Sequence, residues 1–93
     1  MPLSAKINPK AGGPGTKVEI TVEEYDVEEY SDYIKATVSG QPVTKRLRPG
    51  DEKGIFKTEA TVPMGAYYGT YKINLKSVGK EETEETTVTF KIK

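Results

Sequence analysis

The chain contains no cysteine, no histidine and no tryptophan. Without cysteine, no disulfide can hold the fold together and no thiol chemistry can operate. Without histidine, the chain lacks the side chain that serves most often as a general base and as a transition-metal ligand. It also lacks an excess of charge, because 14 basic and 14 acidic residues cancel. A neutral chain has no overall field that would draw it to nucleic acid, so no nucleic-acid partner is expected.

Long apolar runs are absent too. No run approaches the roughly 20 residues that a membrane helix needs, so no membrane insertion is expected. Residues 1–3 lack the charged and apolar regions of a signal peptide, so the chain would be an excised piece of any secreted parent protein. A length of 93 residues fits one domain with one modest core. We therefore expect a single, disulfide-free domain over residues 1–93.

Alternation of apolar and polar residues is the dominant pattern. Val18, Ile20 and Val22 share one face of a segment whose other face is charged or polar, which predicts a half-buried strand. No long helical period is present, and the proline- and glycine-rich residues 8–16 are expected to form a turn region that pairs with no strand. The chain is thus predicted to be an all-β sandwich of two antiparallel sheets. Seven strands are expected, at residues 3–7, 17–23, 33–38, 43–47, 55–62, 69–78 and 86–93.

Four segments of this pattern also carry a family resemblance. They are Gly15-x-x-Val18-x-Ile20-x-Val22, Ile34-x-Ala36-x-Val38, Gly54-x-Phe56-x-x-x-Ala60-x-Val62-Pro63 and Gly69-x-Tyr71-x-Ile73-x-Leu75. They resemble prokaryotic immunoglobulin-like domains, which occur in tandem on surface proteins and in secreted enzymes. The resemblance implies a seven-stranded immunoglobulin-like sandwich with Greek-key connections. It also implies that Tyr71 is the tyrosine whose hydroxyl ties down the connection before its strand.

The function that the resemblance implies is not catalytic. It is a structural or interaction module of a larger extracellular or cell-surface protein, with neighbouring domains or another protein as its partners. One alternative is an accessory domain that docks on a secreted enzyme through an apolar patch around Val27, Met64 and Tyr67. No enzyme activity is expected, because the serines have no histidine to activate them and a small sandwich leaves little cavity.

The most unusual segment, residues 23–33, contains six carboxylates. In the implied topology it emerges at the same end as residues 81–85, so ten of the fourteen carboxylates would gather there. Calcium is bound by several oxygen ligands, so Ca²⁺ is an alternative ligand although no cofactor is required. The spacing is not that of an EF-hand, because Glu29 replaces the required glycine and Lys35 the bidentate glutamate. The candidate metal ligands are Glu24, Asp26, Glu28, Asp32, Glu81 and Glu82.

A simpler interpretation is that these carboxylates are solvated and repel one another. Asp26 could also begin a short helical turn, with Glu29 completing a capping box. Four tyrosines form a second candidate site, because tyrosine rings stack on carbohydrate or pack against a protein partner. The alternative is that they cover the ends of the sandwich. These candidate ligand- or partner-binding residues are Tyr25, Tyr30, Tyr67 and Tyr68.

A small basic cluster lies around the fourth predicted strand. Lys45 interrupts the apolar face of that strand, which is typical of an edge strand that avoids further pairing. The strand could belong to either sheet. We expect the cluster to lie away from the acidic residues and to give the domain a charge dipole, so that successive copies in a tandem array could meet. The cluster comprises Lys45, Arg46, Arg48 and Lys53.

Overall fold

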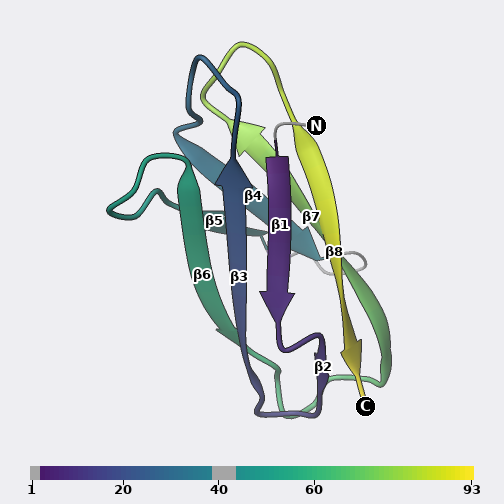
Figure 1. The fold of residues 1–93 in the computed structure, drawn as a ribbon. Helices are drawn as coiled ribbons and strands as arrows, with labels where there is room; N and C mark the ends of the chain where they lie inside the picture. Colours follow the sequence, from purple (N-terminus) through teal and green to yellow (C-terminus); the bar gives the residue numbers. More distant parts are fainter. Residues whose placement is uncertain (1–2, 39–43) are drawn as a thin grey trace.

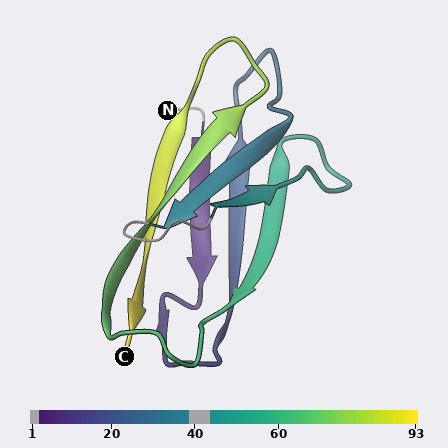
Figure 2. The same cartoon turned by 180° about the vertical axis from the view of Figure 1, so that it is seen from behind.

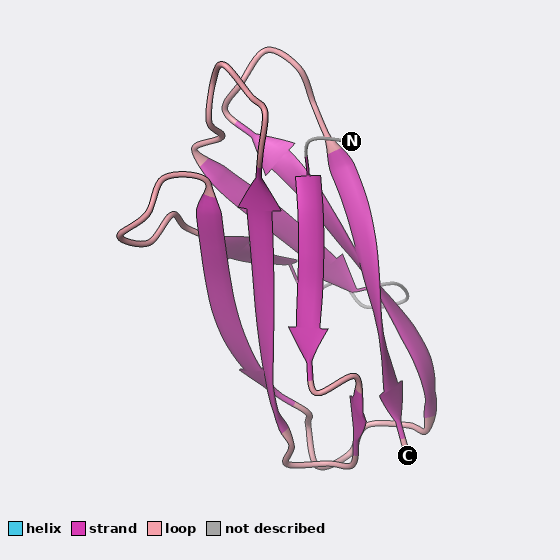
Figure 3. Cartoon of the chain, viewed as in Figure 1, coloured by secondary structure: helices cyan, strands magenta, loops and turns pink. Residues whose placement is uncertain are grey.

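The computed structural model describes residues 3–38 and 44–93, and this part of the chain is built from strands without a helix. It therefore contains no helix long and apolar enough to cross a membrane. Eight strands follow one another through these described residues (Figure 3). They are β1 (Leu3–Asn8), β2 (Ala11–Gly12), β3 (Lys17–Glu24), β4 (Tyr33–Val38), β5 (Thr44–Leu47), β6 (Ile55–Thr61), β7 (Gly69–Val78) and β8 (Glu85–Ile92).

The strands form two sheets, which confirms the predicted all-β sandwich (Figures 1 and 2). One sheet has the order β1-β3-β6 and is antiparallel throughout. The other has the order β2-β8-β7-β4-β5. Strand β5 pairs with β4, which settles the sheet of the fourth predicted strand and places it at an edge. Val43, the first residue of that predicted strand, and the side chain of Lys45 lie outside what the structure describes.

Strand β2 corrects three predictions, the first of which is the number of strands: seven were expected, and the described residues contain eight. Ala11–Gly12 lies within the segment expected to be unpaired, yet it pairs with the end of β8. The pairing is parallel, so the second sheet is mixed and not purely antiparallel. Pro9 and Pro14 flank this strand and lack an amide hydrogen, but they do not prevent the pairing, because the strand accepts hydrogen bonds through its carbonyl groups. The amides of Lys91 and Lys93 donate to the carbonyls of Lys10 and Gly12, each at 3.1 Å.

The core lies between the two sheets and follows the predicted alternation. Every second residue of β3 is buried, in phase with the inward residues of β6. The most completely buried large side chains come from both sheets. Burial of each such side chain stabilises the fold by about 1.5–3 kcal/mol. They are Phe56, Ile34, Leu47, Leu75 and Val22.

The molecule is elongated, with extents of 41 × 24 × 19 Å. The loop between β3 and β4 lies beside the loop between β7 and β8 at the end where the chain starts (Figure 1). The loop between β6 and β7 lies at the opposite end, together with Lys93 (Figure 1). The two ends therefore carry different loops, and β1 begins at one of them whereas β8 finishes at the other.

Candidate functional site

The loops that carry most of the carboxylates come together, as predicted. The amide of Asp32 donates to the carbonyl of Val78 at 2.8 Å, which joins the β3–β4 loop to the start of the β7–β8 loop. The amide of Glu24 donates to the carbonyl of Gly54 at 2.7 Å and ties in the β5–β6 loop as well. We call this end, formed by residues 23–32 and 79–85, the acidic end.

Glu24 is the first departure from the expected picture of solvated acids. It continues the inward phase of Val18, Ile20 and Val22, so its side chain points into the sandwich and the residue is only 4% exposed. Ser31 satisfies both carboxylate oxygens, with its amide donating to Oε1 at 2.8 Å and its hydroxyl to Oε2 at 3.0 Å. For Glu24, the interpretation as a solvated surface acid is wrong.

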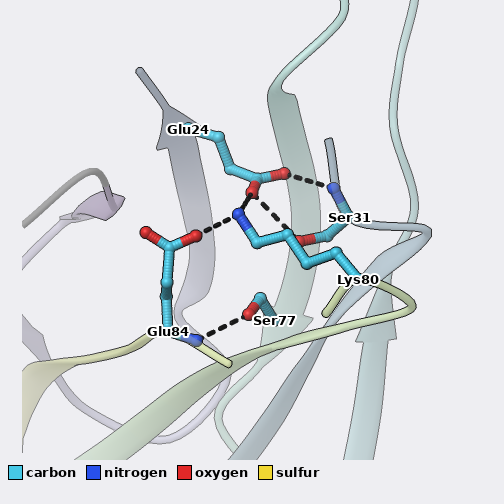
Figure 4. A network of polar contacts seen from close by, with 5 residues as sticks. All are labelled: Glu24, Ser31, Ser77, Lys80 and Glu84. Atoms are coloured by element: carbon cyan, nitrogen blue, oxygen red, sulfur yellow. Dashed lines mark hydrogen bonds and ion pairs between the residues drawn. The ribbon is translucent and has the colours of Figure 1, made fainter. Parts of the chain in front are cut away.

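Lys80 supplies the charge that permits this burial. Its Nζ lies 2.6 Å from Glu24 Oε2 and also pairs with Glu84 Oε1 (Figure 4). The loop that carries Lys80 and Glu84 is closed by Ser77, whose hydroxyl accepts a hydrogen bond from the Glu84 amide at 2.8 Å. The Ser77 amide donates in turn to the Glu84 carbonyl at 2.9 Å. Residues from β3 and from the β7–β8 loop thus share one buried triad.

The triad carries one excess negative charge, because two carboxylates face a single ammonium. Burial by itself lowers the pKa of Lys80, but hydrogen bonds and charge attraction from Glu24 and Glu84 outweigh it and raise the pKa above 10.5. Lys80 is therefore charged at neutral pH. The second carboxylate oxygen of Glu84 is buried and has no hydrogen-bond partner among the described residues. The triad holds two loops together and leaves net negative charge at this end.

The candidate metal ligands do not converge. Glu24 is occupied by Lys80 and Ser31. Asp26 adopts a left-handed backbone conformation, with a φ of 52°, and the predicted helical turn around it does not form. The structure shows no group of three or more acidic side chains, within its described ranges, arranged to hold a metal ion. Calcium binding stays a prediction. The exposed candidates are Asp26, Glu28, Asp32, Glu81 and Glu82.

The four candidate tyrosines divide between the two ends. Tyr25 and Tyr30 lie in the β3–β4 loop and are 42% and 44% exposed. Tyr67 and Tyr68 lie in the β6–β7 loop and are 83% and 80% exposed. The tyrosines therefore form two separate sites. The apolar patch expected around Val27, Met64 and Tyr67 is divided in the same way, so that prediction is wrong.

Tyr71 performs the role predicted for it. Its hydroxyl donates to the carbonyl of Tyr67 at 2.7 Å, which ties the β6–β7 loop to the start of β7. This bond fixes the base of the loop that presents Tyr67, Tyr68 and Met64 to solvent. The tyrosine rings are therefore held on an anchored loop.

A charge dipole is present, but not with the residues expected. Arg46 stacks on the Tyr33 ring, 4.8 Å from its centroid, next to the β3–β4 loop. Gly54, which follows Lys53, packs against Tyr30. The predicted basic cluster thus borders the acidic end and does not lie opposite it.

The positive charge opposite the acidic end comes from lysines far apart in the sequence. Lys17 begins β3, Lys10 precedes β2, and Lys91 and Lys93 lie at the end of β8. All four are exposed, and strand pairing brings Lys10 and Lys91 side by side. We call this end, which also includes the β6–β7 loop, the lysine end.

A cavity of about 480 Å³ opens between the sheets toward the lysine end, which corrects the expectation of little cavity. It lies beside the first residues of β7, next to Ile73, which pairs with Val38 at the end of β4. The described residues that form its walls are mostly apolar and offer no carboxylate, amine or imidazole. The cavity suits an apolar group and not acid–base chemistry. Val18, Val62, Ala66, Tyr71, Phe90 and Ile92 are among its lining residues.

The acidic end could be predicted from the sequence, whereas the triad and the lysine end could not. The alternation through Glu24 was the available signal for its burial, and the four-residue spacing of Lys80 and Glu84 was a weaker one. No protein-family model matches the chain, and no curated protein matches it.

Proposed function

We propose that the chain is a non-catalytic, immunoglobulin-like module that spaces and connects other parts of an extracellular or cell-surface protein. The topology supports this. The order β1-β3-β6 corresponds to strands A, B and E of such sandwiches, and β4, β7 and β8 correspond to C, F and G. Strand β2 then lies beside G, and β5 beside C. The hydrogen bond from Tyr71 to Tyr67 corresponds to the tyrosine corner of these domains.

The observation that carries the proposal is the position of the chain ends. Strand β1 begins at the acidic end, where Leu3 pairs with Glu24, and β8 ends at the lysine end, where Ile92 pairs with Gly12 (Figure 1). Modules with this arrangement join end to end without doubling back, so each one adds its full length to a string. A catalytic role has no such support, because the cavity between the sheets has apolar walls and the chain contains no histidine.

Small-angle X-ray scattering on three copies joined by short linkers tests this proposal. Modules 41 Å long should give an extended particle with a maximum dimension of about 120 Å, three times the single length. The measurement is repeated in about 0.5 M NaCl, where surface charges are screened. A matched control with long glycine–serine linkers shows the flexible limit. A particle that folds back to well under this length at both salt concentrations would contradict the proposal.

A further inference from the structure

Exposed aromatic and large apolar side chains mark both ends of the molecule and spare its sides. Among the described residues, the exposed ones are Tyr25 and Tyr30 at the acidic end, and Met64, Tyr67 and Tyr68 at the lysine end. Tyrosine and methionine are enriched in the cores of protein interfaces, where large side chains provide most of the contact area. Their distribution indicates that contacts form at the two ends and not along the sheets.

Charge surrounds these side chains with opposite sign at each end. The acidic end presents exposed carboxylates around its tyrosines, and the triad adds its excess negative charge. Lys76 pairs with Glu85 there, at 3.7 Å, and Arg46 and Lys53 border this end. At the lysine end, Lys17 pairs with Thr61 just before the β6–β7 loop and Lys91 pairs with Thr70 just after it, while Glu19 and Glu59 face each other two residues further along β3 and β6. The exposed carboxylates of the acidic end, apart from Glu85, are Glu23, Asp26, Glu28, Glu29, Asp32, Glu81 and Glu82.

We propose that the lysine end of one copy docks onto the acidic end of a second copy of this chain. The inference rests on the proposed function in one respect: joined modules bring these two ends together, because the chain leaves one copy at its lysine end and enters the next at its acidic end. The contact is heterologous, so it builds open strings and not closed dimers. Neutral overall charge favours a second copy over a partner of one sign.

The size of the ends limits the strength of the contact. A cross-section of 24 × 19 Å corresponds to a flat face of about 450 Å² per copy, below the roughly 800 Å² per partner of a standard interface. Free copies should therefore associate weakly, and association should depend strongly on salt because exposed charges contribute much of it. Joined copies would experience an effective concentration in the millimolar range, which supports a weak contact.

Charge-reversed variants of the single chain test the contact. One variant carries Lys10→Glu, Lys17→Glu, Lys91→Glu and Lys93→Glu, so both of its ends are acidic. A second carries Glu28→Lys, Glu29→Lys, Glu81→Lys and Glu82→Lys, which makes its acidic end basic and spares the triad. Association is followed by concentration-dependent NMR shifts and translational diffusion up to about 1 mM protein, in about 20 mM and about 0.5 M NaCl.

Wild type should associate at low salt, and about tenfold more weakly at high salt. Each variant alone should lose association about tenfold or more, because like charges then meet. An equimolar mixture of the two should associate again, with shifts at residues 25–30 and 64–68 of the two partners. Shifts confined to these two segments distinguish docking from a general attraction between the two oppositely charged variants.

A matched control reverses four exposed lysines in the strands and leaves both ends unchanged. It has the same change in net charge and should retain association within about twofold of wild type. Monomeric wild type at low salt, equal loss in the control, or no restoration in the mixture would each overturn the proposal. The spacer function is tested separately, because three joined copies that stay extended at high salt would support it even if the contact between the ends does not form. The control changes are Lys6→Glu, Lys35→Glu, Lys57→Glu and Lys72→Glu.

Discussion

Replacing Lys80 with methionine should be the most damaging single change at the acidic end. It leaves the carboxylates of Glu24 and Glu84 facing one another, with side chains only 0% and 10% exposed. Removing one partner of a buried ion pair costs about 3–5 kcal/mol, because the remaining charge is uncompensated. The triad lies at the end of a molecule only 19 Å across its thinnest dimension, so nearby water screens it. We therefore expect the lower value, about 3 kcal/mol.

That loss is a large share of the total. A domain of this length is stable by about 5–14 kcal/mol, and 3 kcal/mol lowers the melting temperature by roughly 12–24 °C. Urea unfolding, followed by far-ultraviolet circular dichroism because the chain lacks tryptophan, measures the change directly.

Two further variants decide whether buried charge is the cause. Lys76→Met breaks an exposed pair, with side chains 48% and 53% exposed, and should cost at most about 1 kcal/mol. Adding Glu24→Gln and Glu84→Gln to Lys80→Met should recover much of the lost stability, because no unpaired charge then remains. Equal losses in Lys80→Met and Lys76→Met would refute the reasoning.

Three other predictions test separate features. The pKa of Lys80 is raised above 10.5 in the folded protein, so its ion pairs stabilise the fold fully below pH 10.5 and progressively less as the pH rises through the folded pKa. The difference in urea midpoint between wild type and Lys80→Met should therefore shrink above pH 10.5, and a constant difference up to about pH 12 would contradict this prediction. Tyr71→Phe removes the bond to the Tyr67 carbonyl and should cost about 0.5–1.5 kcal/mol, with faster amide exchange in the β6–β7 loop but not in β3. Gly54→Ala introduces a Cβ 2.6 Å from the Tyr30 ring at a backbone φ of +82° and should lower the free energy of unfolding by about 1–3 kcal/mol. An unchanged melting temperature would contradict this and show that the loop adapts to the added methyl group.

The strands were predictable because period-two alternation is a local signal. It gave the inward faces of β3, β6 and β7 directly. It also continued to Glu24, whose burial was missed because the carboxylate was interpreted by its charge and not by its position in the alternation. Strand β2 was missed for a different reason. A two-residue strand has no period to detect, and its partner at Lys91–Ile92 is distant in sequence.

Only one of the two charged ends could be predicted from the sequence. The acidic end is visible because its carboxylates occupy two short segments. The lysine end is not, because Lys10, Lys17, Lys91 and Lys93 are spread over both ends of the sequence and meet only through strand pairing. Local composition instead drew attention to the basic residues 45–53, which the fold places beside the acidic end.

The parallel pairing of β2 with β8 determines how the molecule would respond to a pulling force. Tension applied at the two chain ends draws β1 and β2 toward the acidic end and β8 in the opposite direction, along the strands. The bonds from Lys91 to Lys10 and from Lys93 to Gly12 lie across this direction, so both are sheared at once and share the load. The six-residue ladder between β1 and β3 is sheared in the same way. Mechanical resistance therefore resides in the strands at the start and end of the chain.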